Sequence, residues 1–312
     1  MKFRMFFAAA LTAAVTLPIH VDAHGFAGKR FFPATLTTDD PFVADELSLP
    51  TVTSVPNSTS GGAPQTRETD VGVDMSKRIT PNFGVGFDET WQNFKTEKDG
   101  SVSGFANLGV SAKYLLLKSD PSEFLLSVGL DAEIGGTGSK NVGADEFSTL
   151  TPSIFFGKGF GDLPESVALL RPFAVTGAVG IDFPTESQSA GQDGEIERHP
   201  HVLNVGVAIE YSMLYLQSNV RDIELGAPFN HMIPMVEVNL QTPLDRGAAG
   251  QTTATINPGF VWSGQFMQIG LEAIVPVNDR SGNGPGVIGQ IHFYLDDIFP
   301  KTLGRPIFGG TP

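Results

Sequence analysis

The sequence predicts an all-β protein: a transmembrane antiparallel β-barrel of about 12 strands, within a range of roughly 10 to 14. Three observations lead to this fold. Apolar residues alternate with polar or small ones along most of the chain. Beyond residue 23, no stretch reaches the 18 or so uninterrupted apolar residues of a membrane helix, which leaves a closed barrel as the means of spanning. The N-terminus has the pattern of an export signal.

That export signal is predicted over residues 1–23. Lys2 and Arg4 precede the short apolar core MFFAAALTAAVTLP, and Val21 and Ala23 give the spacing of a cleavage site after Ala23. The alternative is an N-terminal membrane anchor, but the core is shorter than the roughly 20 residues that a spanning helix needs. The chain has no cysteine, so no disulfide stabilises it after export.

Residues 24–69 show no clear period and are predicted to be an irregular N-terminal segment and linker. Their second half, TVTSVPNSTSGGAPQTRETD, is rich in Ser, Thr, Pro and Gly. Three roles stay open for the segment: a plug in the lumen, a periplasmic tail, or a partner-binding region.

Alternating runs define the barrel over residues 70–296, followed by a C-terminal tail over 297–312. In EFLLSVGLDAEI (123–134), the apolar row begins at Phe124 and includes Val128, while Asp131 and Glu133 point to the other face. The turn DPSE joins this run to the preceding one, so 104–134 is expected to be a hairpin. Eleven such runs are clear, and the even strand number of bacterial barrels predicts a twelfth.

The composition of the two faces distinguishes a membrane barrel from a soluble β-sandwich. Polar positions are often Gly, Ser, Asn or Gln instead of Lys and Arg, while the apolar face is nearly continuous. Aromatic residues recur near strand ends, as expected at membrane interfaces: Phe83, Trp91, Tyr114, Phe124, Tyr211, Trp262, Phe266 and Tyr294. Short turns alternate with long polar loops such as 137–147 and 185–200. We therefore expect lipid outside and a lumen inside.

The polar parity then predicts the lumen-facing residues that form a candidate solute pathway. These are Lys113, Asp131, Glu133, Glu210, Glu237, Glu272, His292, Asn107, Asn204, Asn239, Gln268 and Gln290. Acids outnumber bases in this set, which favours cations or neutral solutes over anions. The alternative is that these charges are merely solvated, or pair to stiffen the wall.

Other chemistries have little support. The net charge of −14 argues against a nucleic-acid partner. No G-x-S-x-G motif is present, and we expect no enzyme, no cofactor and no metal site. His199 and His201, with Glu195 and Glu197 on the same parity, have the spacing of metal ligands, but a solvated loop explains them better. The expected partners are outer-membrane lipids and a small-molecule solute, and the oligomeric state stays open.

Two segments carry a resemblance to a known family: GKRFFPATLTTDDPFVADELSLP near the N-terminus, and INPGFVWSGQFMQIGLEAIVPVN with GVIGQIHFYLDD near the C-terminus. They resemble the transporter-like outer-membrane proteins named for a MetA pathway of phenol degradation, over most of the mature chain. The resemblance implies a barrel in the outer membrane and a link to uptake of aromatic or other hydrophobic compounds. It supplies no catalytic residues.

The sequence thus predicts an outer-membrane channel or transporter for small solutes, aromatic or hydrophobic ones among them, in a Gram-negative bacterium. Two alternatives differ in class. One is a structural or surface-interaction barrel without transport, whose long loops make the contacts. The other, less favoured, is a barrel enzyme that acts on lipids.

Overall fold

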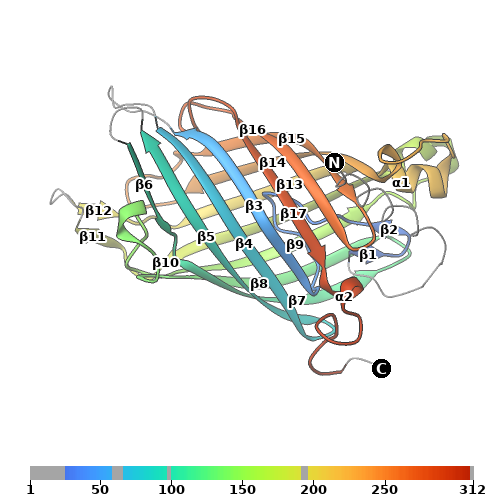
Figure 1. The fold of residues 1–312 in the computed structure, drawn as a ribbon, viewed down its shortest axis with the longest axis horizontal. Coiled ribbons are helices and arrows are strands. Elements are labelled where there is room, and N and C mark those ends of the chain that lie inside the picture. The colour runs from blue at the N-terminus through green and yellow to red at the C-terminus, as the bar shows by residue number, and fades with distance from the viewer. Residues whose placement is uncertain (1–24, 58–65, 97–99, 191–195, 310–312) are drawn as a thin grey trace, which may run out of the picture.

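The computed structural model describes residues 25–57, 66–96, 100–190 and 196–309, and the predicted signal cleavage after Ala23 lies outside them. Within these residues, one antiparallel sheet of twelve strand positions closes on itself as a barrel (Figure 1). The barrel strands are β3 (Glu46–Asn57), β4 (Thr66–Thr80), β5 (Phe83–Thr96), β6 (Gly100–Phe105), β7 (Leu108–Ser119), β8 (Phe124–Ile134), β9 (Thr149–Gly159), β10 (Phe173–Pro184), β13 (Val202–Tyr211), β14 (Met232–Pro243), β15 (Thr253–Ser263), β16 (Met267–Pro276) and β17 (Gly286–Tyr294). The predicted antiparallel barrel of about 12 strands is confirmed.

Closure joins the last strand to the first. β17 pairs antiparallel with β3, with Val287 opposite Ser54, so neither strand leaves an unpaired edge. β6 and β7 together occupy a single position, because β6 pairs with the second half of β5 and β7 with the first half.

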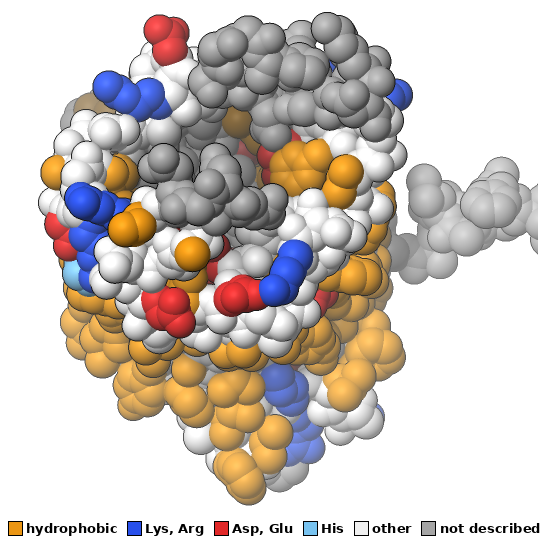
Figure 2. All heavy atoms as spheres, turned by 90° about the vertical axis from the view of Figure 1, so that its left-hand side faces the viewer, with side chains coloured by type: hydrophobic (Ala, Val, Ile, Leu, Met, Phe, Trp, Pro, Cys, Tyr) orange, Lys and Arg blue, Asp and Glu red, His pale blue; other side chains and the backbone are white. Residues whose placement is uncertain are grey.

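The two faces of the wall differ as the alternation predicts. On β8, Leu130 faces outward and is 46% exposed, whereas Leu125 and Ser127 face the interior and have no exposed surface. Its neighbour β9 repeats the pattern, with Ile154 outside and Phe155 inside. Figure 2 looks at the end that carries β6 and shows charged side chains around the rim above a flank of apolar ones. An apolar flank below a polar rim is the surface that a bilayer requires.

The barrel begins earlier than the sequence predicted. Residues 24–69 were expected to be irregular, but β3 starts at Glu46 and β4 at Thr66, so the boundary at residue 70 is wrong. The sequence did not predict β3 because this strand contains Pro50 and Pro56. A proline has no N–H to donate to the hydrogen bonds of a sheet, so its presence argues against a central strand. The structure accommodates Pro50 with a shift of register between Ser48 and Thr51, a bulge that tolerates the missing N–H.

The two ends of the barrel carry different connections. The end that holds both the start of β3 and the end of β17, here called the terminal end, has short turns at 81–82, 120–123 and 264–266. Two longer connections also lie there, with short helical turns η2 (Glu165–Leu170), α1 (Met213–Tyr215), η3 (Leu216–Val220) and η4 (Phe229–His231). The opposite end, the loop end, holds η1 (Lys140–Val142) and the hairpin of β11 (Gln188–Ala190) and β12 (Ile196–Arg198). No helix in the described part of the chain is long and apolar enough to cross a membrane.

The C-terminal tail folds back onto the terminal end. After α2 (Leu295–Ile298), the carbonyls of Leu303 and Arg305 accept hydrogen bonds from Lys77 Nζ, and the Gly304 carbonyl accepts one from Arg78. Both basic side chains also bind the buried carboxylate of Asp45, at 2.7 and 2.8 Å. The tail is therefore tied to the start of the barrel.

Candidate functional site: the luminal segment and its cavities

Residues 25–45, here called the luminal segment, run inside the barrel. The segment starts with a small hairpin of β1 (Phe26–Ala27) and β2 (Arg30–Phe31) at the terminal end, where the Gly28 N–H donates to Asp120 in the β7–β8 turn. Gly28 has φ +61°, and a Cβ there would lie 2.3 Å from the Asp120 carbonyl oxygen, so this approach requires glycine.

A buried ionic network fixes the base of the luminal segment. Arg30 has no exposed surface; its Nε lies 3.3 Å from Glu123 Oε2, and its Nη1 donates to the Pro172 carbonyl at 2.8 Å. The guanidinium also lies 3.8 Å from the ring centroid of Tyr215. Burial and the nearby Glu123 carboxylate raise the pKa of Tyr215 to about 12, so its hydroxyl keeps the proton and donates to Glu123 at 3.0 Å. Each charge therefore has a partner, as burial demands.

The tip of the luminal segment is held by a single carboxylate in the middle of β14. Glu237 accepts hydrogen bonds from the backbone N–H groups of Leu36, Thr37 and Thr38, and from the Thr37 hydroxyl at 2.6 Å. Consecutive N–H groups that converge on one anion form a concave binding geometry. Asn257 on β15 also donates to the Thr37 hydroxyl oxygen. The tip is thus bound to the barrel wall through polar contacts.

An apolar cluster packs beside this polar contact. Leu36 lies among the inward-facing Ala208, Met235, Val261 and Ile288. Gly270 faces Leu36 as well, and a Cβ there would lie 2.5 Å from its side chain. Packing as well as hydrogen bonds therefore holds the luminal segment inside the barrel.

On the opposite wall the luminal segment meets Lys113 of β7. The Lys113 Nζ donates to Asp39 Oδ1 and to the Asp40 carbonyl, both at 2.8 Å. The ammonium also lies 4.5 Å from the ring centroid of Phe155. This lysine is thereby committed to the luminal segment.

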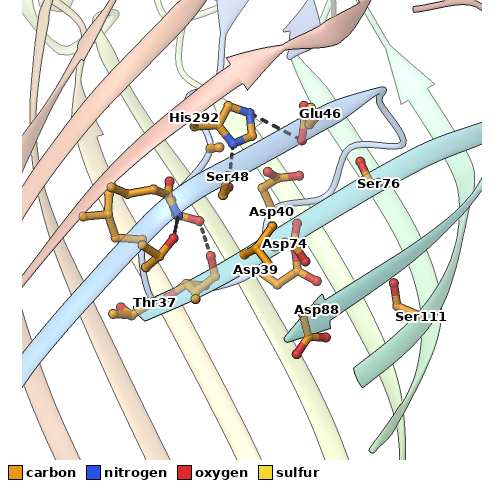
Figure 3. Close-up of a pocket in the computed structure, with 18 of the residues that line it drawn as sticks. Thr37, Asp39, Asp40, Glu46, Ser48, Asp74, Ser76, Asp88, Ser111 and His292 are labelled. Carbon is orange, nitrogen blue, oxygen red and sulfur yellow. Dashed lines mark hydrogen bonds and ion pairs between the residues drawn. The ribbon is translucent and has the colours of Figure 1, made fainter. Parts of the chain in front are cut away.

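The lumen holds three open cavities, two of which border the tip of the luminal segment. Cavity 1, about 480 Å³, lies between it and the wall formed by β3, β4, β5, β7, β8 and β17 (Figure 3). Cavity 2, about 710 Å³, lies against β9, β10 and β13 to β16, and cavity 3, about 470 Å³, reaches the loop end beside Asn107 and Asp145. Asp131 lines all three, so they meet at its side chain.

All twelve residues of the predicted pathway face the interior. Eight line the cavities: Asn107, Lys113, Asp131, Glu133, Asn204, Asn239, Gln290 and His292. Four are at most 2% exposed and lie deeper: Glu210, Glu237, Gln268 and Glu272. Gln268 donates to the Ala34 carbonyl of the luminal segment at 2.6 Å. Eight of the twelve predicted residues therefore line the cavities, and the other four lie buried in the barrel wall. The role of these residues in a solute pathway stays a prediction.

Some residues of the lumen were not singled out from the sequence. Asp74 on β4 and Asp88 on β5 line cavity 1. The alternating runs DVGVDMSKRI and FGVGFDETW, which place Val73 and Phe87 on the apolar face, already implied this direction. Arg30 and Glu123 had no such signal. Glu123 lies in the β7–β8 turn with φ 47°, is 3% exposed, and has its carboxylate 3.3 Å from Arg30 Nε.

Other side chains also differ from simple expectations. Tyr294, grouped with the interfacial aromatics, is 1% exposed; its hydroxyl contacts Ser263 and Gln268 inside the barrel. His199 stacks on Phe147, with ring centroids 4.0 Å apart, whereas His201 contacts Asp245. The two histidines thus have separate partners, and the structure describes no cluster of metal-ligating residues in the parts it covers; Glu195 lies outside them.

The barrel is similar to solved outer-membrane structures. One is an outer membrane channel from Pseudomonas putida F1, with a TM-score of 0.56 and 10% identity over 80% of this chain and 95% of that one. Others are the NanC porin (TM-score 0.47, 9% identity, 78% and 98% covered) and the beta domain of the Bordetella autotransporter BrkA (TM-score 0.45, 13% identity, 81% and 99% covered). No family model and no curated protein matches the sequence, so the resemblance to the phenol-degradation family is not confirmed. The likeness to the Pseudomonas channel shows that the chain has the fold of an outer-membrane β-barrel.

Proposed function

We infer that the protein is a channel for small solutes in the outer membrane of a Gram-negative bacterium, narrowed by its own luminal segment. The observation that carries this proposal is the set of three cavities that meet at Asp131. A barrel whose only task was structural would not need such a space beside the segment. The apolar flank and the likeness to an outer membrane channel support the same location.

The charge of the lining indicates the class of solute. Among the described residues that line cavity 1, seven are Asp or Glu and one is Lys. Cavity 3 adds Glu133, Asp145 and Asp182. Acid-lined pores favour cations and neutral molecules over anions. We therefore propose selectivity for cations.

Aromatic or hydrophobic solutes are the second candidate, because cavity 2 has an apolar part. Phe155 and Ile274 line it, between polar side chains such as Asn204 and Asn257. A site with apolar walls and a few polar groups suits a small molecule with an aromatic or aliphatic portion. The uptake of such compounds is a proposal that the lining of cavity 2 supports.

The test is conductance of the purified full chain in planar bilayers, with liposome swelling for neutral solutes. We expect ion flux with a reversal potential that favours K⁺ over Cl⁻, and swelling with small sugars. A barrel that inserts but passes no ion or solute would contradict the channel and favour the structural or surface-interaction alternative. Under that alternative, deletion of the loop 185–200 should abolish the surface contacts that the barrel makes.

A further inference from the structure

Cavity 1 has the size of a small-molecule site. Its volume of about 480 Å³ exceeds by far the roughly 30 Å³ of one water and lies in the range of ligand pockets. Its walls come from the luminal segment and from six barrel strands (Figure 3). A solute in the lumen would therefore be enclosed on several sides here.

Three carboxylates of this cavity have no ion-pair partner among the described residues. Asp74, Asp88 and Asp131 form no hydrogen bond or ion pair with any other residue that the structure describes, whereas Lys113 is bound to Asp39 and the Asp40 carbonyl. Figure 3 shows Asp74 and Asp88 on neighbouring strands beside Asp39. Uncompensated acids in a confined space attract cations strongly.

Gln290 gives an independent indication of a ligand. Its side chain lines cavity 1 and is only 9% exposed. The amide nitrogen donates to the Thr51 hydroxyl at 3.1 Å, but Oε1 has no partner among the described atoms. A buried amide oxygen without a donor is costly, so the site calls for an N–H or O–H group.

The spread of these acceptors defines the shape of the ligand. Asp74 lies on β4 and Asp131 on β8, with β5 and β7 between them, so three strand spacings of ~4.8 Å separate them along the wall, roughly 14 Å. Gln290 is on β17, on the other side of β3 from β4. One ammonium group reaches acceptors within about 3 Å only. A single small cation cannot contact acceptors so far apart.

We propose that cavity 1 binds an organic cation with two amino groups, a diamine, through Asp74, Asp88, Asp131 and the free oxygen of Gln290. The inference rests on the proposed channel, because the solute has to enter the lumen. Each ammonium donates to carboxylates at one part of the wall, and the methylene chain between them spans the cavity. The ligand thereby supplies the positive charge and the N–H donors that the cavity lacks.

The test is isothermal titration of the full chain in detergent with 1,6-diaminohexane, whose ammonium groups can reach carboxylates roughly 14 Å apart. We expect binding that is absent with 1,6-hexanediol, which has a similar shape but no charge. Asp74→Asn and Asp88→Asn each keep the shape of the side chain and remove its charge, and each should weaken binding about tenfold. Glu146→Gln is the matched control, because this exposed loop acid lies outside cavity 1. The affinity of this variant for the diamine should equal that of the wild type.

Three outcomes would overturn the diamine site: no heat with diaminohexane, equal affinity in the wild type and both cavity variants, or displacement of the diamine by Mg²⁺ at equal concentration, which would indicate a metal site. Liposome swelling with a neutral sugar separates this inference from the channel. Sugar flux without diamine binding removes the site and keeps the channel. Diamine binding without any flux keeps the site and removes the channel.

Discussion

Glu237 on β14 binds Thr37 of the luminal segment through both the backbone and the side chain: Oε2 lies 3.1 Å from the Thr37 nitrogen and 2.6 Å from its hydroxyl oxygen. The carboxylate has no exposed surface and is satisfied by groups of the segment tip. Loss of this one side chain would free several N–H groups at once, so the contact controls how firmly the segment sits in the lumen.

The first prediction follows from that contact. Glu237→Ala should release the tip and increase single-channel conductance.

Thiol labelling measures the release directly. Because the chain has no cysteine, Thr38→Cys introduces a unique thiol at a residue that is 3% exposed. We expect slow labelling of this thiol in the parent and labelling at least about tenfold faster with Glu237→Ala, since release exposes the tip. Glu133→Gln, a luminal change away from the tip, should leave the rate unchanged; equal rates in all three would contradict the role of Glu237.

The second prediction concerns the buried pair at the base of the segment. Arg30→Ala leaves Glu123 buried without its cation, and we expect the free energy of unfolding to fall by about 3–5 kcal/mol. Arg30→Met with Glu123→Gln removes both charges and should recover a large part of that loss. Urea unfolding in detergent, followed by tryptophan fluorescence, measures both. A double variant as unstable as the single one would show that packing of Arg30, and not its charge, matters.

The alternation of apolar and polar residues made the barrel predictable. Successive side chains of a strand point to opposite faces, so Asp131 and Glu133 could be assigned to the lumen without any knowledge of the neighbouring strands. The same rule applied to β4 and β5 would have assigned Asp74 and Asp88 as well. The first strand was lost because Pro50 and Pro56 mask its period, and the bulge that accommodates Pro50 depends on pairing with β4.

The contents of the lumen were not predictable in this way. Arg30 meets Glu123 across 93 residues of sequence, and Thr37 meets Glu237 across 200. No local period encodes such contacts, because they depend on where an aperiodic segment enters the closed barrel. The sequence therefore left plug, tail and binding region as equal alternatives, whereas the contacts of Arg30 and Thr37 place the segment inside.

The third prediction tests which face meets lipid. Ile154 is at the centre of β9, pairs with Val128 of β8, and is 53% exposed on the outer face. Ile154→Arg should lower the free energy of unfolding in lipid vesicles by about 2–4 kcal/mol, because a charge near the bilayer midplane is poorly solvated. Ser153→Arg, one residue away, points into cavity 2 and should cost less while it changes ion selectivity. Equal costs would contradict the assignment of the faces.

The fourth prediction concerns the loop 244–252 at the loop end. Asp245 Oδ1 accepts a hydrogen bond from the His201 N–H at 2.9 Å, and Oδ2 lies 2.6 Å from the His201 ring nitrogen. These bonds, the backbone one foremost, lower the pKa of Asp245 below its ordinary value. A lowered carboxyl pKa means that the contact stabilises the loop fully above the ordinary Asp pKa of about 3.9 and is lost as the pH falls through the lower folded value. Limited proteolysis by pepsin should therefore cut this loop in the wild type only at the most acidic pH values at which pepsin is active.

The Asp245→Asn variant has no carboxylate to protonate, so pepsin should cut its loop over the whole pH range in which the protease is active. A cleavage profile identical to that of the wild type would contradict the anchoring role of Asp245.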